Sequence, residues 1–92
     1  MKEEQLSYRV HIKNSAKSDL RKVKQSHLKS AFDKIVEQLK HDPFEKNQGF
    51  EKPEPPMARK YSRRMTVQHR VVYTVDKERK IVSIYSAWSH YE

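Results

Sequence analysis

Cysteine is absent from the 92 residues of this chain, and glycine occurs only once, at Gly49. Without a thiol the protein can form no disulfide framework and no thiolate metal site, and it cannot use a cysteine nucleophile. The lack of disulfides fits a reducing compartment. A chain of this length buries roughly 60–65% of the surface that its unfolded form exposes. We therefore expect a single domain over residues 1–92 with a modest core.

The sequence also lacks a long apolar stretch. No run approaches the roughly 18 apolar residues that a membrane-spanning helix needs. Residues 1–5 carry two acidic groups where a signal peptide would be apolar, and we interpret them as a flexible N-terminal extension. The sequence therefore predicts a cytoplasmic protein that does not associate with a membrane.

Acidic residues are few in comparison with basic ones. Twenty Lys and Arg residues against twelve Asp and Glu residues give a formal net charge of +8 at pH 7. A field of this sign attracts polyanions, namely nucleic acid, an anionic membrane surface or an acidic protein. The stretch 55–75 contains no acid. It holds five basic residues, which are Arg59, Lys60, Arg63, Arg64 and Arg70.

Apolar residues follow clear periodicities, which argues against disorder. Leu6–Lys13 alternates apolar and polar residues, as a half-buried strand does. Residues 14–25 and 26–41 carry apolar side chains at helical spacing, and each segment begins with serine or asparagine side chains that are suited to an N-cap. Pro43 ends the second helix.

The second half of the chain predicts strands. Residues 44–57 form a long loop, and strands follow at 60–67, 70–75 and 80–88, with a polar hairpin connection at 76–79. Short connections favour antiparallel pairing. The expected fold class is α+β: a strand and two helices followed by three to four antiparallel strands, with both helices on one face of the sheet. Basic strand residues would then lie on the other face.

Three kinds of side chain fit metal-free cleavage of RNA. Glu54 lies between prolines, and its carboxylate could remove the proton of a 2′-hydroxyl group. Guanidinium groups such as those of Arg64 and Arg70 bind phosphate through two parallel hydrogen bonds. An unperturbed histidine changes its charge near cellular pH, so His90 could protonate the departing 5′-oxygen. On the residues alone this is one candidate among several, because Glu54 fits an ion pair better and a histidine near a chain end is more often a bystander.

Four sequence elements, taken together and in order, resemble the signature of the Txe/YoeB branch of the RelE-like toxins. They are Lys52-Pro53-Glu54-Pro55, Tyr61-Ser62-Arg63-Arg64, Gln68-His69-Arg70-Val71-Val72-Tyr73 and Ser89-His90-Tyr91. Any one element alone is a weak signal, whereas the ordered set is specific. The resemblance extends from about Leu6 to Tyr91.

The resemblance implies a RelE-like fold, with two helices against an antiparallel sheet of four or five strands. It implies a toxin of a type II toxin–antitoxin pair that cleaves mRNA in the ribosomal A site and so inhibits translation. No metal or other cofactor is expected, since no two of the five histidines have the spacing of a metal site. The implied partner is a YefM-type antitoxin whose C-terminal segment folds over the active site. We expect that segment to be acidic because the surface that it would cover is basic. The protein could also form a homodimer.

Carried onto this sequence, the resemblance gives four catalytic residues. Glu54 matches the general base and His90 the general acid, Arg70 a position that stabilises the transition state, and Tyr91 a residue that orients the substrate or supports the acid. The residues expected to bind substrate or phosphate are Arg64, Arg63, Arg59, Lys60 and Lys52.

The chain departs from the family pattern in three places. The linker between Pro55 and Ser62 is shorter than in the best-known members, so residues within it cannot be matched one for one. Gln68 stands where some members carry an acid. Glu92 extends the chain beyond the His-Tyr end and adds negative charge there.

Two other functions are compatible with the composition. A ParE-like toxin would act on DNA gyrase and would not need an acid–base pair such as Glu54 and His90. A non-catalytic basic module would bind RNA or the ribosome. In that case, changes at Arg64 and Arg70 would weaken binding, while a change at His90 would have no effect.

Overall fold

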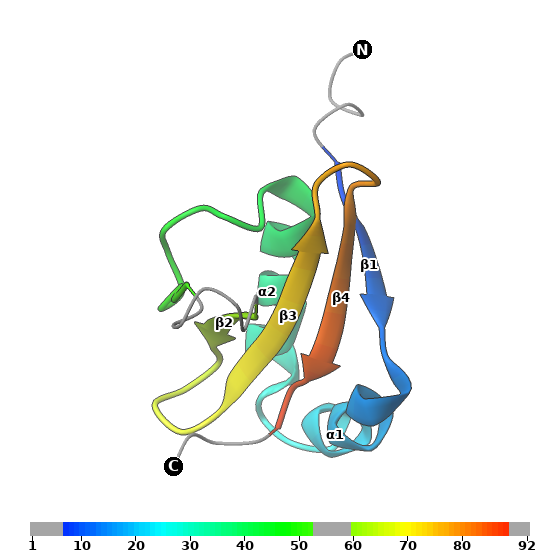
Figure 1. Cartoon of the computed structure of the whole chain (residues 1–92). Coiled ribbons are helices and arrows are strands. Elements are labelled where there is room, and N and C mark those ends of the chain that lie inside the picture. Colours follow the sequence, from blue (N-terminus) through cyan, green and yellow to red (C-terminus); the bar gives the residue numbers. More distant parts are fainter. Residues whose placement is uncertain (1–6, 53–59, 89–92) are drawn as a thin grey trace.

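The computed structural model describes residues 7–52 and 60–88. Their order along the chain is β1 (Arg9–Ile12), α1 (Asn14–Lys24), α2 (Lys29–His41), β2 (Tyr61–Arg64), β3 (Arg70–Asp76) and β4 (Ile81–Ser86) (Figure 1). The predicted succession of one strand, two helices and three further strands is confirmed. No helix within these residues is both long enough and apolar enough to cross a membrane.

The four strands form one sheet in the order β1-β4-β3-β2. β2 pairs with β3 and β3 with β4 in antiparallel fashion, as the short connections predicted, whereas β1 pairs with β4 in parallel. The family resemblance implied an antiparallel sheet, but the parallel pairing of β1 with β4 makes the sheet mixed. A parallel partner needs a long crossover, and both helices, β2 and β3 separate β1 from β4 along the chain.

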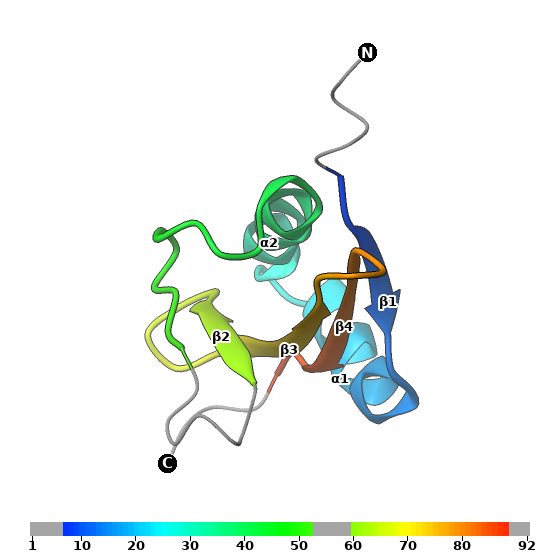
Figure 2. The same cartoon turned by 45° about the horizontal axis from the view of Figure 1, so that its top comes forward.

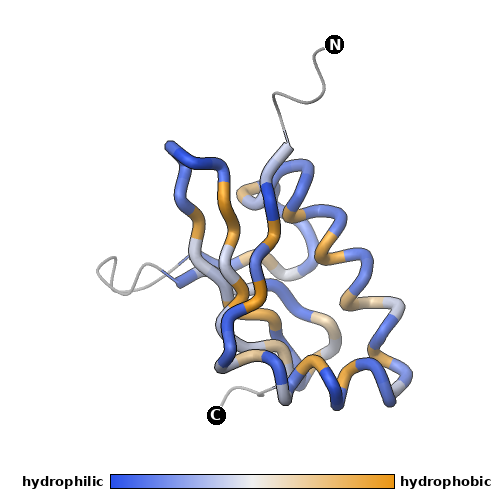
Figure 3. Tube along the Cα trace, turned by 90° about the vertical axis from the view of Figure 1, so that its right-hand side faces the viewer, coloured by the Kyte–Doolittle hydropathy of each residue, from blue (hydrophilic) through white to orange (hydrophobic). Residues whose placement is uncertain are grey.

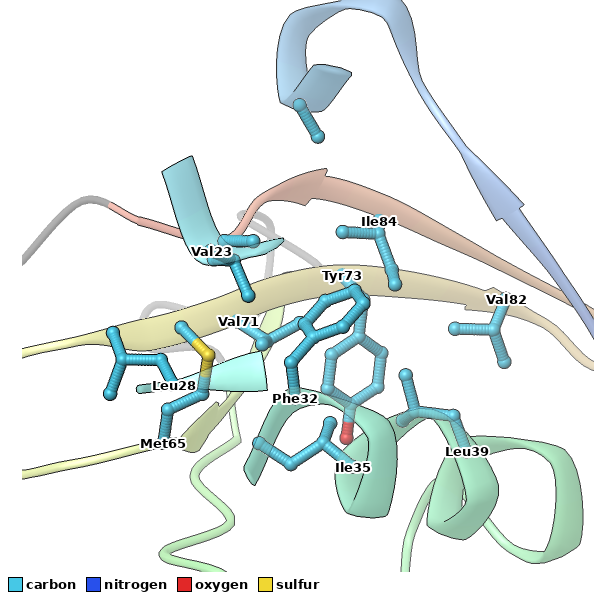
Figure 4. Close-up of a cluster of buried hydrophobic side chains, with 12 residues drawn as sticks. Val23, Leu28, Phe32, Ile35, Leu39, Met65, Val71, Tyr73, Val82 and Ile84 are labelled. Carbon is cyan, nitrogen blue, oxygen red and sulfur yellow. The ribbon is translucent and has the colours of Figure 1, made fainter. Parts of the chain in front are cut away.

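Both helices lie on one side of the sheet (Figures 2 and 3). Alternate residues of the central strands point towards them and are fully buried: Val71, Tyr73, Val82 and Ile84. The helices contribute the periodic apolar side chains Val23, Phe32, Ile35 and Leu39 to the same cluster (Figure 4). Each such side chain stabilises the fold by roughly 1.5–3 kcal/mol on burial. No helix within the described residues covers the opposite face of the sheet.

The serine and asparagine side chains at the helix starts do not act as the predicted N-caps. α1 begins after Lys13 without a side-chain cap, and Ser15 Oγ donates instead to the carbonyl oxygen of Tyr85 at 2.9 Å. Ser26 Oγ donates to the carbonyl oxygen of Val23 and accepts from the amide of Leu28. The hydroxyl of Ser26 therefore shapes the turn between the helices, and Ser15 ties α1 to β4.

A buried guanidinium group connects the sheet to the loop that follows α2. Arg63 in β2 has no exposed surface. Its Nε donates to Tyr73 Oη at 3.0 Å, and its Nη2 donates to the carbonyl oxygens of Pro43 at 3.0 Å and Glu45 at 2.8 Å. Nη1 donates to Asn47, through both its carbonyl oxygen at 3.0 Å and Oδ1 at 2.6 Å. A buried charge is tolerated only when its donors are satisfied, and the loop supplies the acceptors.

Tyr73 completes this network. Its hydroxyl accepts from Arg63 and donates to the carbonyl oxygen of Pro43 at 2.7 Å. Burial raises the pKa of Tyr73 to about 12, against an opposing effect of the nearby Arg63 charge. Because the neutral phenol is the form that the interior accepts, the pKa in the folded state lies above the ordinary value of 10.0.

Replacing Arg63 with lysine should lower the free energy of unfolding by about 3 kcal/mol or more. A lysine has three donors on one atom and cannot reach the acceptors of three loop residues, so buried carbonyl groups lose their partners. Urea unfolding measures the loss. The matched control is Arg79→Lys in the exposed turn before β4, which should change stability by less than about 0.5 kcal/mol. A similar small change at Arg63 would contradict the assigned role.

Tyr73 should make stability fall as the pH rises from 10 to about 12. Below this window the phenol is protonated in both states. Within it the unfolded chain loses the proton and the folded chain keeps it, so unfolding becomes easier by up to about 2–3 kcal/mol. Denaturant unfolding at a series of pH values in wild type and Tyr73→Phe tests this, since the other tyrosines and the lysines titrate in both. Parallel curves for the two proteins would refute the prediction.

Candidate functional site

Arg64 and Arg70 lie directly opposite each other on adjacent antiparallel strands. Their neighbours Arg63 and Val71, also paired, are fully buried, so the two arginines point to the face of the sheet that the helices leave open. The expectation that basic strand residues lie on the face opposite the helices is thus confirmed for Arg64 and Arg70 and wrong for Arg63. Like charges directly opposite each other repel, so an anion close by stabilises the pair.

Glu51 supplies that anion. Its Oε1 lies 2.8 Å from Arg70 Nη1, and its Oε2 lies 4.0 Å from Arg64 Nη2. Arg70 Nη1 also donates to Ser62 Oγ at 3.3 Å. The side chain of Arg70 is 12% exposed, compared with 45% for Arg64 and 53% for Glu51. One guanidinium group is therefore held in a mostly buried position, and the second is free to adjust.

The backbone fixes Glu51 beside the arginines. The amide of Glu51 donates to the carbonyl oxygen of Ser62 at 2.9 Å, and the amide of Ser62 donates back at 3.1 Å, so residue 51 extends the sheet by one antiparallel bridge. No local pattern in the sequence points to Glu51, because its pairing with Ser62 joins a loop to a strand that follows later in the chain. An exposed carboxylate in such a pair contributes up to about 1 kcal/mol, so an incoming phosphate can displace it.

The loop before Glu51 closes tightly over Arg64. The amide of Arg64 donates to the carbonyl oxygen of Gln48 at 2.8 Å. Gly49 has φ +67°, and a Cβ atom at this position would lie 2.9 Å from Arg64 Cγ. The only glycine in the chain therefore stands where both the backbone conformation and the close approach require it.

The other residues expected to bind substrate differ in their positions. Lys52 and Lys60 are exposed, and Lys52 lines a shallow hollow with Gly49 and Phe50. Arg63 is buried with its donors committed to the loop, so we propose a structural role for it in place of phosphate contact. Four expected site residues lie outside the described part of the chain: Glu54, Arg59, His90 and Tyr91.

No group of three His, Asp or Glu side chains within residues 7–52 and 60–88 is arranged to hold a metal ion. The cationic side chains of the open face are the mostly buried guanidinium group of Arg70, the more exposed one of Arg64 and nearby lysines. Such a set can bind a phosphodiester and stabilise extra negative charge on it.

Comparison with known proteins supports the resemblance seen in the sequence. Residues 12–91 match the family described as the YoeB-like toxin of bacterial type II toxin–antitoxin systems. No curated protein sequence matched.

Solved structures share the fold. A YoeB/ParE toxin from Agrobacterium tumefaciens aligns with a TM-score of 0.79 at 22% identity, covering 90% of this chain and 99% of that one. A YoeB dimer from Staphylococcus aureus aligns with a TM-score of 0.77 at 24% identity, covering 92% and 99%. The YoeB–YefM complex from the same organism gives 0.75 at 24% identity, covering 91% and 98%.

Replacing Glu51 with glutamine should increase affinity for a short single-stranded RNA by up to about fivefold, the equivalent of the roughly 1 kcal/mol of an exposed ion pair. The amide keeps a hydrogen bond to Arg70 but no longer competes with phosphate. Fluorescence anisotropy measures the affinity. Glu78→Gln, in the turn between β3 and β4, makes the same change in net charge and should have a smaller effect. Weaker binding by Glu51→Gln would mean that the carboxylate holds Arg70 in its binding geometry.

Proposed function

The chain belongs to the YoeB-like toxins of bacterial type II toxin–antitoxin systems, and we propose that it is a ribosome-dependent endoribonuclease that cleaves mRNA in the A site. The observation that carries this proposal is the pairing of Arg64 with Arg70 on the open face of the sheet. Two guanidinium groups on one face, bridged by a displaceable carboxylate, are suited to a phosphodiester whose negative charge grows during the reaction.

The proposed reaction is an attack of the 2′-oxygen on the adjacent phosphorus. Glu54 takes the proton of the 2′-hydroxyl group, the bond between O2′ and phosphorus forms, and the bond between phosphorus and O5′ breaks. His90 gives its proton to O5′, which leaves as a hydroxyl group, and the other product carries a 2′,3′-cyclic phosphate. Tyr91 orients the substrate or supports His90. The roles of these three residues come from the family resemblance.

The arginines stabilise the crowded phosphorane between these proton transfers. Arg70 is mostly shielded from water, which strengthens its attraction to the developing charge. Ser62 Oγ accepts a hydrogen bond from Arg70 Nη1 and can keep the guanidinium group in place when the phosphate displaces Glu51. Arg64 is more exposed and can follow the phosphate as its geometry changes.

We also propose an antitoxin partner. The S. aureus neighbour is a complex of YoeB with YefM, and a RelBE2 toxin–antitoxin complex from Mycobacterium tuberculosis shares the fold. A net charge of +8 favours an acidic segment that is disordered when free and folds on binding. Such a segment would neutralise the toxin by occupying the Arg64 and Arg70 pair. A homodimer, as in the S. aureus YoeB dimer, is a further proposed state.

Primer extension on a defined mRNA in a purified translation reaction tests the activity. We expect new 5′ ends inside translated codons, only when ribosomes are present. His90→Gln and Glu54→Gln should reduce their yield by about 100-fold or more, since each removes a proton-transfer group. Both variants should still cosediment with ribosomes, whereas Arg70→Ala should lose cleavage and part of its binding.

The alternatives predict different results in this reaction and in a separate assay of gyrase supercoiling. Stalled ribosomes without cut ends, unchanged by His90→Gln, would identify a basic binding module and overturn the proposal. Inhibition of gyrase supercoiling without any mRNA cleavage would identify a ParE-like toxin. Lys34→Met, on the exposed side of α2, is the control for a general loss of charge.

A further inference from the structure

Tyr85 is an aromatic residue on the open face of the sheet that the proposed reaction does not use. Val82 and Ile84 are fully buried beneath the helices, so the strand alternation directs their neighbours to the open face. Tyr85 is half-buried, so part of this residue is exposed on the open face. Figure 3 shows this side of the sheet without a helix over it.

A β-bulge positions Tyr85. Val72 pairs with Ser86 and Tyr73 pairs with Ile84, so Tyr85 is the extra residue of β4 at this point. Bulges change the direction of a side chain and are common beside functional sites. The other edge of β4 is fixed by β1 and α1, because the amide of Lys13 donates to the carbonyl oxygen of Ile84 at 3.0 Å and Ser15 Oγ donates to that of Tyr85. The ring thus projects from a well-held backbone.

Two ammonium groups lie over the Tyr85 ring. Lys60 Nζ is 4.8 Å and Lys13 Nζ is 5.5 Å from the ring centroid. They come from opposite edges of the sheet, since Lys60 precedes β2 and Lys13 follows β1. Within the described residues neither ammonium group pairs with a carboxylate. The aromatic ring gathers two cations that are available to an incoming anion.

We infer that Tyr85, Lys13 and Lys60 form a subsite for one nucleotide of single-stranded RNA. The base stacks on the tyrosine ring, and the two ammonium groups move from the ring to the flanking phosphates. The subsite adjoins the arginine pair: Val72 lies opposite the bulge, and Arg70 is two residues away on the same face of β3, about 7 Å along the strand. One extended strand can therefore reach both places.

The stacking ring favours RNA over an acidic protein segment as the ligand. Carboxylates would use the lysines and leave the ring uncovered, whereas a nucleotide uses the ring for its base and the lysines for its phosphates. This inference rests on the proposed function, because it concerns the path of the substrate whose phosphate binds at Arg64 and Arg70.

The test is a double-mutant cycle that combines the Tyr85→Leu variant with an RNA that lacks one base. Anisotropy measures binding of a labelled RNA hexanucleotide whose 2′-hydroxyl groups are methylated, so that cleavage is blocked, and of versions with a single abasic position. We expect Tyr85→Leu to weaken binding of the intact RNA by about 5- to 100-fold and Tyr85→Phe to leave it unchanged. For one abasic position, the RNA should bind the wild-type protein as weakly as the intact RNA binds Tyr85→Leu. Binding of that abasic RNA to Tyr85→Leu should be no weaker still.

The lysines have a separate expected effect. The logarithm of the binding constant falls linearly with the logarithm of the salt concentration. Lys13→Met and Lys60→Met should each make this slope shallower by about 0.7, whereas Lys34→Met on α2 should leave it unchanged. Unchanged melting temperatures of the variants exclude misfolding.

Three outcomes would each overturn the subsite. Affinity could fall equally for every abasic RNA, Tyr85→Leu could have no effect, or the wild-type protein could fail to bind the methylated RNA. If Tyr85→Leu instead weakened only the binding of a polyglutamate peptide, the surface would be a protein contact. Cleavage on ribosomes is measured in a separate reaction. A lack of cleavage would contradict the proposed function, whereas the binding measurements test the subsite.

Discussion

The buried guanidinium group of Arg63 is the interaction on which the site depends. It lies in the core and forms no ion pair within residues 7–52 and 60–88. Its charge is stabilised by the backbone carbonyl groups of Pro43, Glu45 and Asn47 and by the Tyr73 hydroxyl. Without Arg63, the carbonyl groups of this loop would form hydrogen bonds with water. Their attraction to one buried cation gives the loop a single conformation, which is the condition for any precise placement of the residues that follow it.

The position of Glu51 follows from that conformation. Once residues 43–48 are fixed around Arg63, Gly49 passes close to Arg64, and Glu51 reaches the edge of β2 and pairs with Ser62. The carboxylate then bridges Arg64 and Arg70 on the open face. The chain uses the two faces of one short strand for different purposes, because strand alternation directs Arg63 inward and Arg64 outward.

Much of the fold was predictable from hydrophobic periodicity. The spacing of Phe32, Ile35 and Leu39 predicted α2, the alternation around Val10 predicted β1, and the short connections predicted the antiparallel pairs. The parallel partner of β1 was not predictable, since nothing local distinguishes which distant strand completes the edge. Glu51 and the bulge at Tyr85 were missed for the same reason, because pairing between distant segments creates both features.

The burial of Arg63 was missed for a different reason, and it bears on how the family signature is understood. Arginine is mostly exposed in proteins, so two adjacent arginines in a basic stretch favoured phosphate binding for both. Strand geometry allows this for only one of them. A loss of activity after substitution therefore has two physical meanings within the same Ser-Arg-Arg element: loss of a loop's conformation at Arg63 and loss of an anion contact at Arg64. Only a measurement of stability beside that of binding separates them, because a collapsed loop would also displace Glu51 and so alter the arginine pair indirectly.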